Sequence, residues 1–170
     1  MENELEKLYL EHSHRIYRYI YFQVRQVQLA EDLTQETFYR AFKNFHTYKK
    51  RASVSTWLLR IARNATYDYF RRKRIIQIIG FEKEELIVSG NATPEEEILQ
   101  KDSATQLYGA LDSLKKDYKD VLILRKLNEN TIKETAYILG WTETKVKSTM
   151  QRAFAALKEE MYRMEGKRDE

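Results

Sequence analysis

Six polar residues between positions 144 and 152 have the side-chain chemistry of a surface that reads DNA. Lys and Arg bind phosphate oxygens, and Gln, Ser and Arg hydrogen-bond to base edges when a helix lies in a major groove. Apolar residues recur between them at helical spacing, so a helix would bury one set and expose the other. The polar set is Thr144, Lys145, Lys147, Ser148, Gln151 and Arg152, and the apolar set is Val146, Met150, Ala153 and Leu157. Because Lys and Gln also occupy ordinary helix surfaces, a solvated helical hairpin is the plainer interpretation.

The segment around them, residues 131–157, has the spacing of a helix-turn-helix. Ala136 is small enough for a second helix to pack close, and Gly140 permits a tight turn four residues later. Val146, on the second helix, would then lock the pair together. The sequence therefore predicts a helix-turn-helix whose second helix carries the polar set.

A second candidate DNA surface lies on a helix predicted over residues 53–74, with Ser53 as its N-cap. Rings and guanidinium planes stack on unpaired bases, Asn hydrogen-bonds to base edges and Arg binds phosphate. Such side chains recur every three or four residues along this helix, and a basic loop precedes it. The helix residues are Trp57, Arg60, Asn64, Tyr67 and Arg71, and the loop residues are Lys49, Lys50 and Arg51. Two plainer explanations are that Trp57 belongs to the core and that the basic helix end complements the helix dipole.

An acidic patch is predicted on a helix over residues 29–46, within a half of the chain that is otherwise basic. Asp32, Gln35 and Glu36 face away from the apolar side of this helix. Asp32 and Glu36 are like charges four residues apart, which costs an isolated helix a few tenths of a kcal/mol. A basic protein partner would relieve this repulsion, and a solvated acidic face is the alternative.

Composition excludes several classes of protein. The 170-residue chain has no Cys, which rules out disulfides and cysteine-ligated zinc, and it has only five Gly and one Pro. It has no apolar run as long as a membrane span and no signal-peptide pattern, so we expect a cytoplasmic protein. The three His and the scattered carboxylates lack the spacing of a metal or catalytic site. We therefore expect no cofactor, no metal and no enzymatic activity.

Charge and periodicity together predict two domains. Residues 1–74 contain 15 Lys and Arg against 8 Asp and Glu, residues 75–110 contain 2 against 7, and residues 111–170 contain 13 against 11. Two basic segments around an acidic spacer favour two lobes that bind a polyanion. We expect an all-α fold with domains at 1–75 and 104–165, joined by a flexible acidic linker at 76–103. The predicted helices span 2–27, 29–46, 53–74, 94–113 and 116–127, followed by the helix-turn-helix.

In this order the segments resemble the extracytoplasmic-function (ECF) sigma factors of bacterial RNA polymerase, over nearly the whole chain. AEDLTQETFYRAF at 30–42 resembles the family's polymerase-binding helix. SVSTWLLRIARNATYDYFRR at 53–72 resembles its helix for the minus-ten promoter element. LDSLKKDYKDVLILR and TIKETAYILGWTETKVKSTMQRAFAALK resemble the domain that binds the minus-thirty-five element. Three such segments in the right order, with a spacer, are far more specific than any one of them.

The resemblance implies a factor that binds core RNA polymerase at its clamp coiled coil and flap, recognises both promoter elements and promotes initiation. It also implies a stress or envelope response under the control of an anti-sigma factor. Loop 47–53 would capture a base flipped out of the minus-ten element, in a pocket lined by Asn64. The stripe on residues 53–74 with its basic loop would bind the minus-ten element, and the polar set would bind the minus-thirty-five element. The implied polymerase contacts are Asp32, Leu33, Gln35, Glu36 and Phe38.

The chain departs from the family pattern at a few positions. It lacks the Pro usual between Leu114 and Tyr118, so we expect a changed turn there. Lys147 stands where Arg is usual, and Lys cannot form the bidentate fork to guanine. The alternative function is a free-standing helix-turn-helix regulator that acts without polymerase. That function would explain the second domain but would leave the acidic patch and the 53–74 stripe unexplained.

Overall fold

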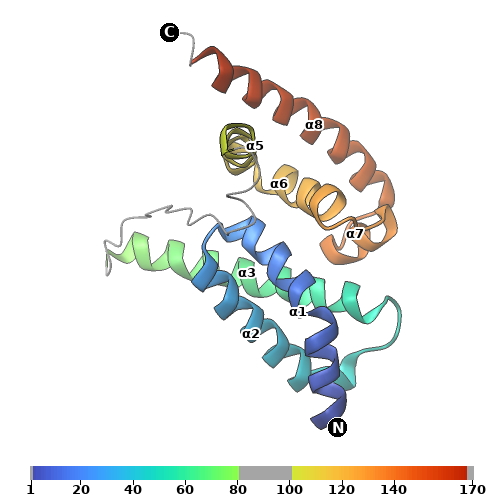
Figure 1. Cartoon of the computed structure of the whole chain (residues 1–170). Coiled ribbons are helices and arrows are strands. Elements are labelled where there is room, and N and C mark those ends of the chain that lie inside the picture. The colour runs from blue at the N-terminus through green and yellow to red at the C-terminus, as the bar shows by residue number, and fades with distance from the viewer. Residues whose placement is uncertain (1, 81–100, 168–170) are drawn as a thin grey trace. The chain divides into compact units, whose positions relative to one another are not determined.

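The computed structural model describes residues 2–80 and 101–167, which belong to two compact units. Every regular element within these ranges is a helix, so the all-α prediction is confirmed (Figure 1). The first unit contains α1 (Glu2–Val24), α2 (Val27–Lys43) and α3 (Val54–Ile79). The second contains α5 (Lys101–Ser113), α6 (Lys116–Leu122) and α8 (Glu143–Gly166), and α7 (Ile132–Leu139) lies between α6 and α8 in the chain. Two short helical turns, η1 (Phe45–Thr47) and η2 (Ile123–Leu127), complete the described elements.

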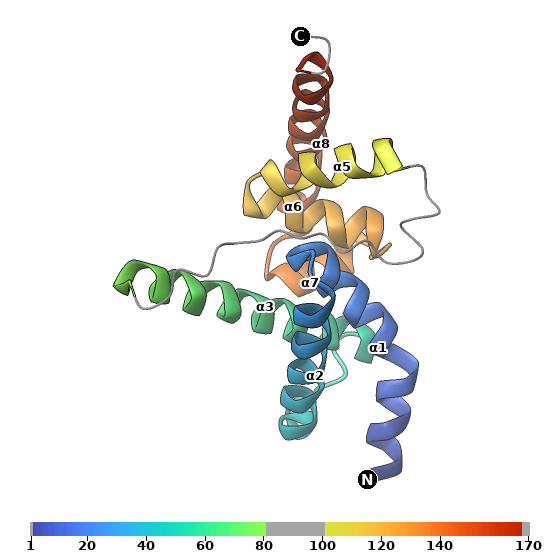
Figure 2. The ribbon, with the colours of Figure 1, turned by 60° about the vertical axis from the view of Figure 1, so that its left-hand side comes forward.

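The first unit is a three-helix assembly in which α2 and α3 each pack against α1 and against each other (Figure 2). Each helix turns one apolar stripe inward, as the i, i+3, i+4 spacing predicted. The fully buried side chains are large on α1, whereas α2 and α3 also bury alanines, which let the helices approach closely. They include Ile16, Tyr19, Ile20, Ala30, Phe38, Leu58, Leu59 and Ala62.

The break between α1 and α2 falls earlier than predicted. We predicted a first helix to residue 27, but α1 ends at Val24 and α2 begins at Val27. Arg25 adopts φ +55° and donates its backbone N–H to the Tyr21 carbonyl oxygen at 2.7 Å. Because Arg25 is in the left-handed conformation, the chain reverses direction within two positions. No Gly or Pro in the sequence indicates this turn.

The third helix is longer than predicted. It continues past the basic run to Ile79 and ends at Gly80, whose φ of +79° is the left-handed conformation of a glycine C-cap. Residues 75–79, which we predicted to lie beyond the helix and, from residue 76, in the flexible linker, are therefore helical. In both views this end of α3 runs beyond α1 and α2 (Figures 1 and 2). Residues 81–100 of the predicted linker, with the start of the predicted helix 94–113, lie outside the described residues, and its last positions, 101–103, belong to α5 rather than to a linker.

In the second unit, α8 packs against α5 and α6. The buried side chains come from all three helices and include Ala110, Leu111, Val121, Leu122, Val146 and Ala153. The helix predicted over 116–127 is α-helical only to Leu122, and the Asn128 N–H then bonds to the Ile123 carbonyl at 2.8 Å. This i→i−5 bond makes η2 a π-helical turn. Ahead of α6, Lys115 has φ −55° and ψ 144°, which are values that a proline would also adopt.

Candidate nucleic-acid and partner surfaces

The predicted helix-turn-helix forms as a capped helix, a glycine turn and a second capped helix. At the start of α7, the Thr131 hydroxyl accepts from the Glu134 N–H at 3.1 Å, and the Glu134 carboxylate accepts from the Thr131 N–H at 2.7 Å. This is a reciprocal capping box. Gly140 has φ +68°, and the following Trp141 N–H donates to the Ala136 carbonyl at 3.0 Å. Thr142 then caps α8 by accepting from the Lys145 N–H at 3.1 Å.

Helix α8 separates its residues as the sequence predicted. Val146, Met150 and Ala153 are buried, with Thr149 beside them, whereas Leu157 is only half-buried. Ser148 is half-buried and donates to the Lys145 carbonyl oxygen at 3.2 Å. The exposed members of the polar set are Thr144, Lys145, Lys147, Gln151 and Arg152. Five of the six predicted contacts are therefore solvent-exposed on one side of the helix.

Along α3, the predicted stripe divides into exposed and buried members. Arg60, Asn64 and Arg71 are exposed, and Tyr67 is half-buried with the Arg63 guanidinium 4.2 Å from its ring centroid. Trp57 is only 8% exposed, so the plainer explanation of a core residue describes its position in this structure.

The buried indole of Trp57 supports the basic loop. Its ring centroid lies 5.1 Å from that of Tyr48 and 6.0 Å from that of Phe45. The Tyr48 hydroxyl donates to the Ala52 carbonyl at 2.7 Å, which closes the loop just before Ser53 caps α3. Lys49, Lys50 and Arg51 are all exposed on this closed loop. The aromatic residues therefore present three cations next to the start of α3.

The five predicted polymerase contacts on α2 divide in a similar way. Asp32 and Gln35 are exposed and Glu36 is half-buried, whereas Leu33 and Phe38 are buried in the three-helix core. The Gln28 amide donates to the Asp32 carboxylate at 3.1 Å, which offsets part of the like-charge repulsion predicted from Asp32 and Glu36. The surface available to a partner is therefore the three polar residues, held in place by the two apolar ones.

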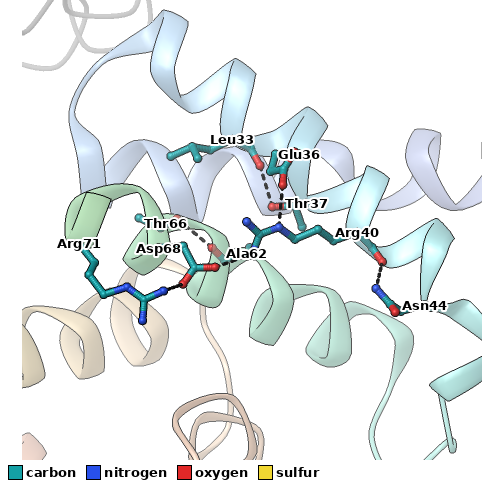
Figure 3. A network of polar contacts seen from close by, with 9 residues as sticks. All are labelled: Leu33, Glu36, Thr37, Arg40, Asn44, Ala62, Thr66, Asp68 and Arg71. Carbon is teal, nitrogen blue, oxygen red and sulfur yellow. Dashed lines mark hydrogen bonds and ion pairs between the residues drawn. The ribbon is translucent and has the colours of Figure 1, made fainter. Parts of the chain in front are cut away.

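Glu36 begins a chain of ion pairs that crosses from α2 to α3 (Figure 3). Arg40 donates from Nε to Glu36 Oε1 and from Nη1 to Asp68 Oδ2, both at 2.7 Å. Arg71 donates from Nη2 to the second oxygen of Asp68 at 3.1 Å. The pKa of Arg40 is raised above its ordinary value, first by the hydrogen bond to Asp68 and then by the one to Glu36. Arg40 thus remains charged while it connects the two helices.

Comparison with known proteins identifies the family. The protein-family model for sigma-70 region 2 matches residues 8–75, and the family model for sigma-70 region 4 matches residues 104–157. The chain is 32% identical over 166 residues to the ECF RNA polymerase sigma factor SigX of Bacillus subtilis, covering 95% of this chain and 85% of SigX. It is 31% identical over 160 residues to the RNA polymerase sigma factor YlaC of the same bacterium, covering 94% and 92% of the two chains.

The chain belongs to the ECF sigma factors. As a member of this family it binds core RNA polymerase and recognises promoter DNA to initiate transcription. Its fold also resembles that of the sigma factor RpoE from Bartonella quintana, solved with the anti-sigma factor NepR. The TM-score is 0.77 at 21% identity, and the match covers 95% of this sigma factor and 98% of RpoE.

Two members of the ion-pair chain in this sigma factor, Arg40 and Asp68, were absent from the sequence-based site. The i, i+4 spacing of Glu36 and Arg40 was a visible signal for one pair. Asp68 is 28 residues further along the chain, and only the packing of α3 on α2 brings it to Arg40.

No grouping of three or more His, Cys, Asp or Glu side chains that could hold a metal occurs within 2–80 and 101–167 of this sigma factor. Among the same residues, no helix has the length and apolar character that crossing a membrane requires.

Proposed function

We propose that this sigma factor docks on core polymerase through Asp32, Gln35 and Glu36 and reads its promoter through exposed faces of α3 and α8. The observation that carries the proposal is that α3 and α8 each have a buried apolar face and an exposed polar face. Each helix buries an apolar stripe in its own unit and turns Arg and amide side chains to solvent. A helix face whose charged and amide side chains are exposed to solvent is accessible to nucleic acid.

The acidic face of α2 is proposed to dock on a basic coiled coil of the polymerase clamp. Opposite charges set the orientation and the rate of such an encounter more than its final affinity. Asp32 and Gln35 are exposed and close to the half-buried Glu36, so all three can face one partner.

The basic loop and α3 are proposed to bind the minus-ten element and help to open it. Lys49, Lys50 and Arg51 would contact phosphates, and Asn64 would hydrogen-bond a base flipped out of the stack. Trp57 is proposed to act here by supporting Tyr48 beneath the loop, since its ring is already buried against that residue.

The start of α8 is proposed to enter the major groove at the minus-thirty-five element. Arg152 and Gln151 can reach base edges, while Lys145 and Lys147 are suited to phosphate. The Lys145 ammonium lies 4.1 Å from the Trp141 ring centroid, a cation–π contact that orients it beside the helix N-terminus.

An anti-sigma partner is also proposed, because RpoE of Bartonella quintana, whose fold is similar, was solved in complex with one. In this proposal the sigma factor has no enzymatic activity of its own and works in the cytoplasm, where polymerase and chromosome meet. Inhibition in a stress or envelope response would then consist of covering the surfaces described above.

In vitro transcription from a genomic fragment library, with bacterial core polymerase and with or without this chain, tests the proposed function. New start sites that share two upstream elements are expected. If no new starts appear while the chain alone binds specific DNA, the free-standing regulator is correct instead.

The docking surface is tested by the double substitution Asp32→Lys and Glu36→Lys, which should abolish binding to core polymerase. The control is Glu4→Lys with Glu6→Lys, two exposed positions on α1 that change the net charge equally. Equal binding by the two double variants would contradict the proposed docking role.

A further inference from the structure

The ion-pair chain of Figure 3 joins two surfaces that the proposed function treats separately. Glu36 belongs to the polymerase-docking face of α2, and Arg71 belongs to the DNA face of α3. Between them, Arg40 is shared by two carboxylates and Asp68 is shared by two guanidinium groups. A new partner for Glu36 at one end of this row of ion pairs therefore alters how strongly Asp68 holds Arg71 at the other end.

Exposure shows which link opens most easily. The Arg40 side chain is 28% exposed and that of Asp68 is 36% exposed, whereas that of Arg71 is 73% exposed. The Arg40–Asp68 pair, at 2.7 Å, is also shorter than the Arg71–Asp68 pair, at 3.1 Å. Arg71 is thus the residue that can most easily leave its ion pair with Asp68 and bind another anion, such as a DNA phosphate.

We infer that Arg40 and Asp68 are positioning residues through which engagement of Glu36 releases Arg71 for DNA. In the free protein, Asp68 holds Arg71 and competes with phosphate for it. When a cation of the polymerase pairs with Glu36, Arg40 turns to Asp68 alone and neutralises it more completely. Arg71 then loses its intramolecular partner as the sigma factor joins the polymerase. This inference rests on the proposed roles of Glu36 and Arg71.

The test uses the isolated 170-residue chain and a fluorescently labelled single-stranded oligonucleotide of mixed sequence, with affinity measured by anisotropy. Asp68→Asn should tighten binding because Arg71 is released, by about two- to fivefold for exposed ion pairs. Arg40→Met should weaken binding by a similar factor, because Asp68 is then left wholly to Arg71.

The two variants break the same Arg40–Asp68 pair, so a merely structural role would move both affinities in the same direction. Opposite directions are therefore required, but they do not suffice, because the two substitutions also change the net charge in opposite directions. Glu36→Gln should also tighten binding modestly, because it removes one competitor for Arg40 just as the polymerase would.

Two controls separate this effect from net charge and from the proposed site. Asp112→Asn makes the same charge change at another ion pair, where Lys119 lies 2.7 Å away in the second unit, and should not match Asp68→Asn. In an Arg71→Ala background, Asp68→Asn should no longer tighten binding.

Tightening that persists without Arg71, or equal tightening by Asp112→Asn, would overturn the inference and leave the proposed function standing. A change of affinity in the same direction for Asp68→Asn and Arg40→Met would also overturn the inference. If Arg71→Ala alone leaves DNA binding unchanged, the proposed DNA contact of Arg71 is itself wrong, and the inference is overturned with it.

Discussion

Arg152 and Lys147 share the exposed face of α8, but their head groups can make different contacts with a base pair. A guanidinium can donate two parallel hydrogen bonds to a guanine, whereas an ammonium acts as a point charge. We predict that Arg152→Ala lowers affinity for a matched minus-thirty-five element by about 1–3 kcal/mol. Lys147→Ala should weaken binding to all sequences about equally. Competition binding with matched and single-base-substituted duplexes measures both.

Lys158→Ala serves as the control for this prediction, because Lys158 is exposed on α8 outside the polar set. It should change neither affinity nor sequence preference. An Arg152→Ala loss of the same size on every duplex would identify Arg152 as a phosphate contact.

Residue types and helical spacing located the exposed polar positions of α2, α3 and α8, because one-sided burial follows directly from periodicity. Residue types and spacing did not determine whether Trp57 is exposed or buried, because that depends on how Tyr48 and Phe45 pack against its ring from the loop. They also missed Asp68, since the partner of a charge on another helix is a property of packing.

At the scale of elements, the side-chain caps of α7 and α8 fix where the helix-turn-helix begins each helix. Thr142→Ala removes the acceptor for the Lys145 N–H and should lower stability by about 0.5–2 kcal/mol. Thr142→Ser keeps the hydroxyl and should retain most of that stability. Thermal unfolding followed by circular dichroism measures both, and equal losses for the two variants would show that the hydroxyl is not the cause.

The turn between α7 and α8 depends on the left-handed conformation of Gly140. A Cβ at this position would meet nothing within 4 Å, so any cost of a side chain is conformational. We predict that Gly140→Ala destabilises the protein by roughly 1–2 kcal/mol. Gly140→Asn should cost less, because Asn tolerates φ > 0. If the Ala variant unfolds at the temperature of the unsubstituted protein, the turn does not need the glycine conformation.

Element boundaries were less predictable than element existence. Ser53 was predicted as an N-cap and caps α3 with its side chain, whereas the side-chain cap of α8 by Thr142 was not predicted. The end of α3 was placed too early because the basic run resembled a helix terminus, although the isoleucines beyond it continue the helix to Gly80. The turn at Arg25 and the π-helical turn η2 had no sequence signal, because neither contains Gly or Pro.

For the whole molecule, two observations were enough to predict two units: the charge pattern, and the helical spacing of apolar residues on both sides of the acidic spacer. Each unit needs its own core. Each unit carries one proposed DNA surface of modest size. Two modest surfaces on one chain act together because binding of the first raises the effective concentration of the second. Tight and selective promoter use should therefore require the covalent connection between the units.

A protease site inserted between residues 90 and 91 tests this requirement in the otherwise unchanged chain. After cleavage, activity at nanomolar concentrations should fall by about 10²–10⁴-fold, the avidity that a linker supplies, and should recover as the concentration of the cleaved protein is raised. Run-off transcription from one promoter with both elements is the measurement. The same insertion without protease is the control, and it should leave activity unchanged. Equal activity of cut and uncut protein at low concentration would show that polymerase holds each unit independently, so that the connection contributes nothing to promoter use.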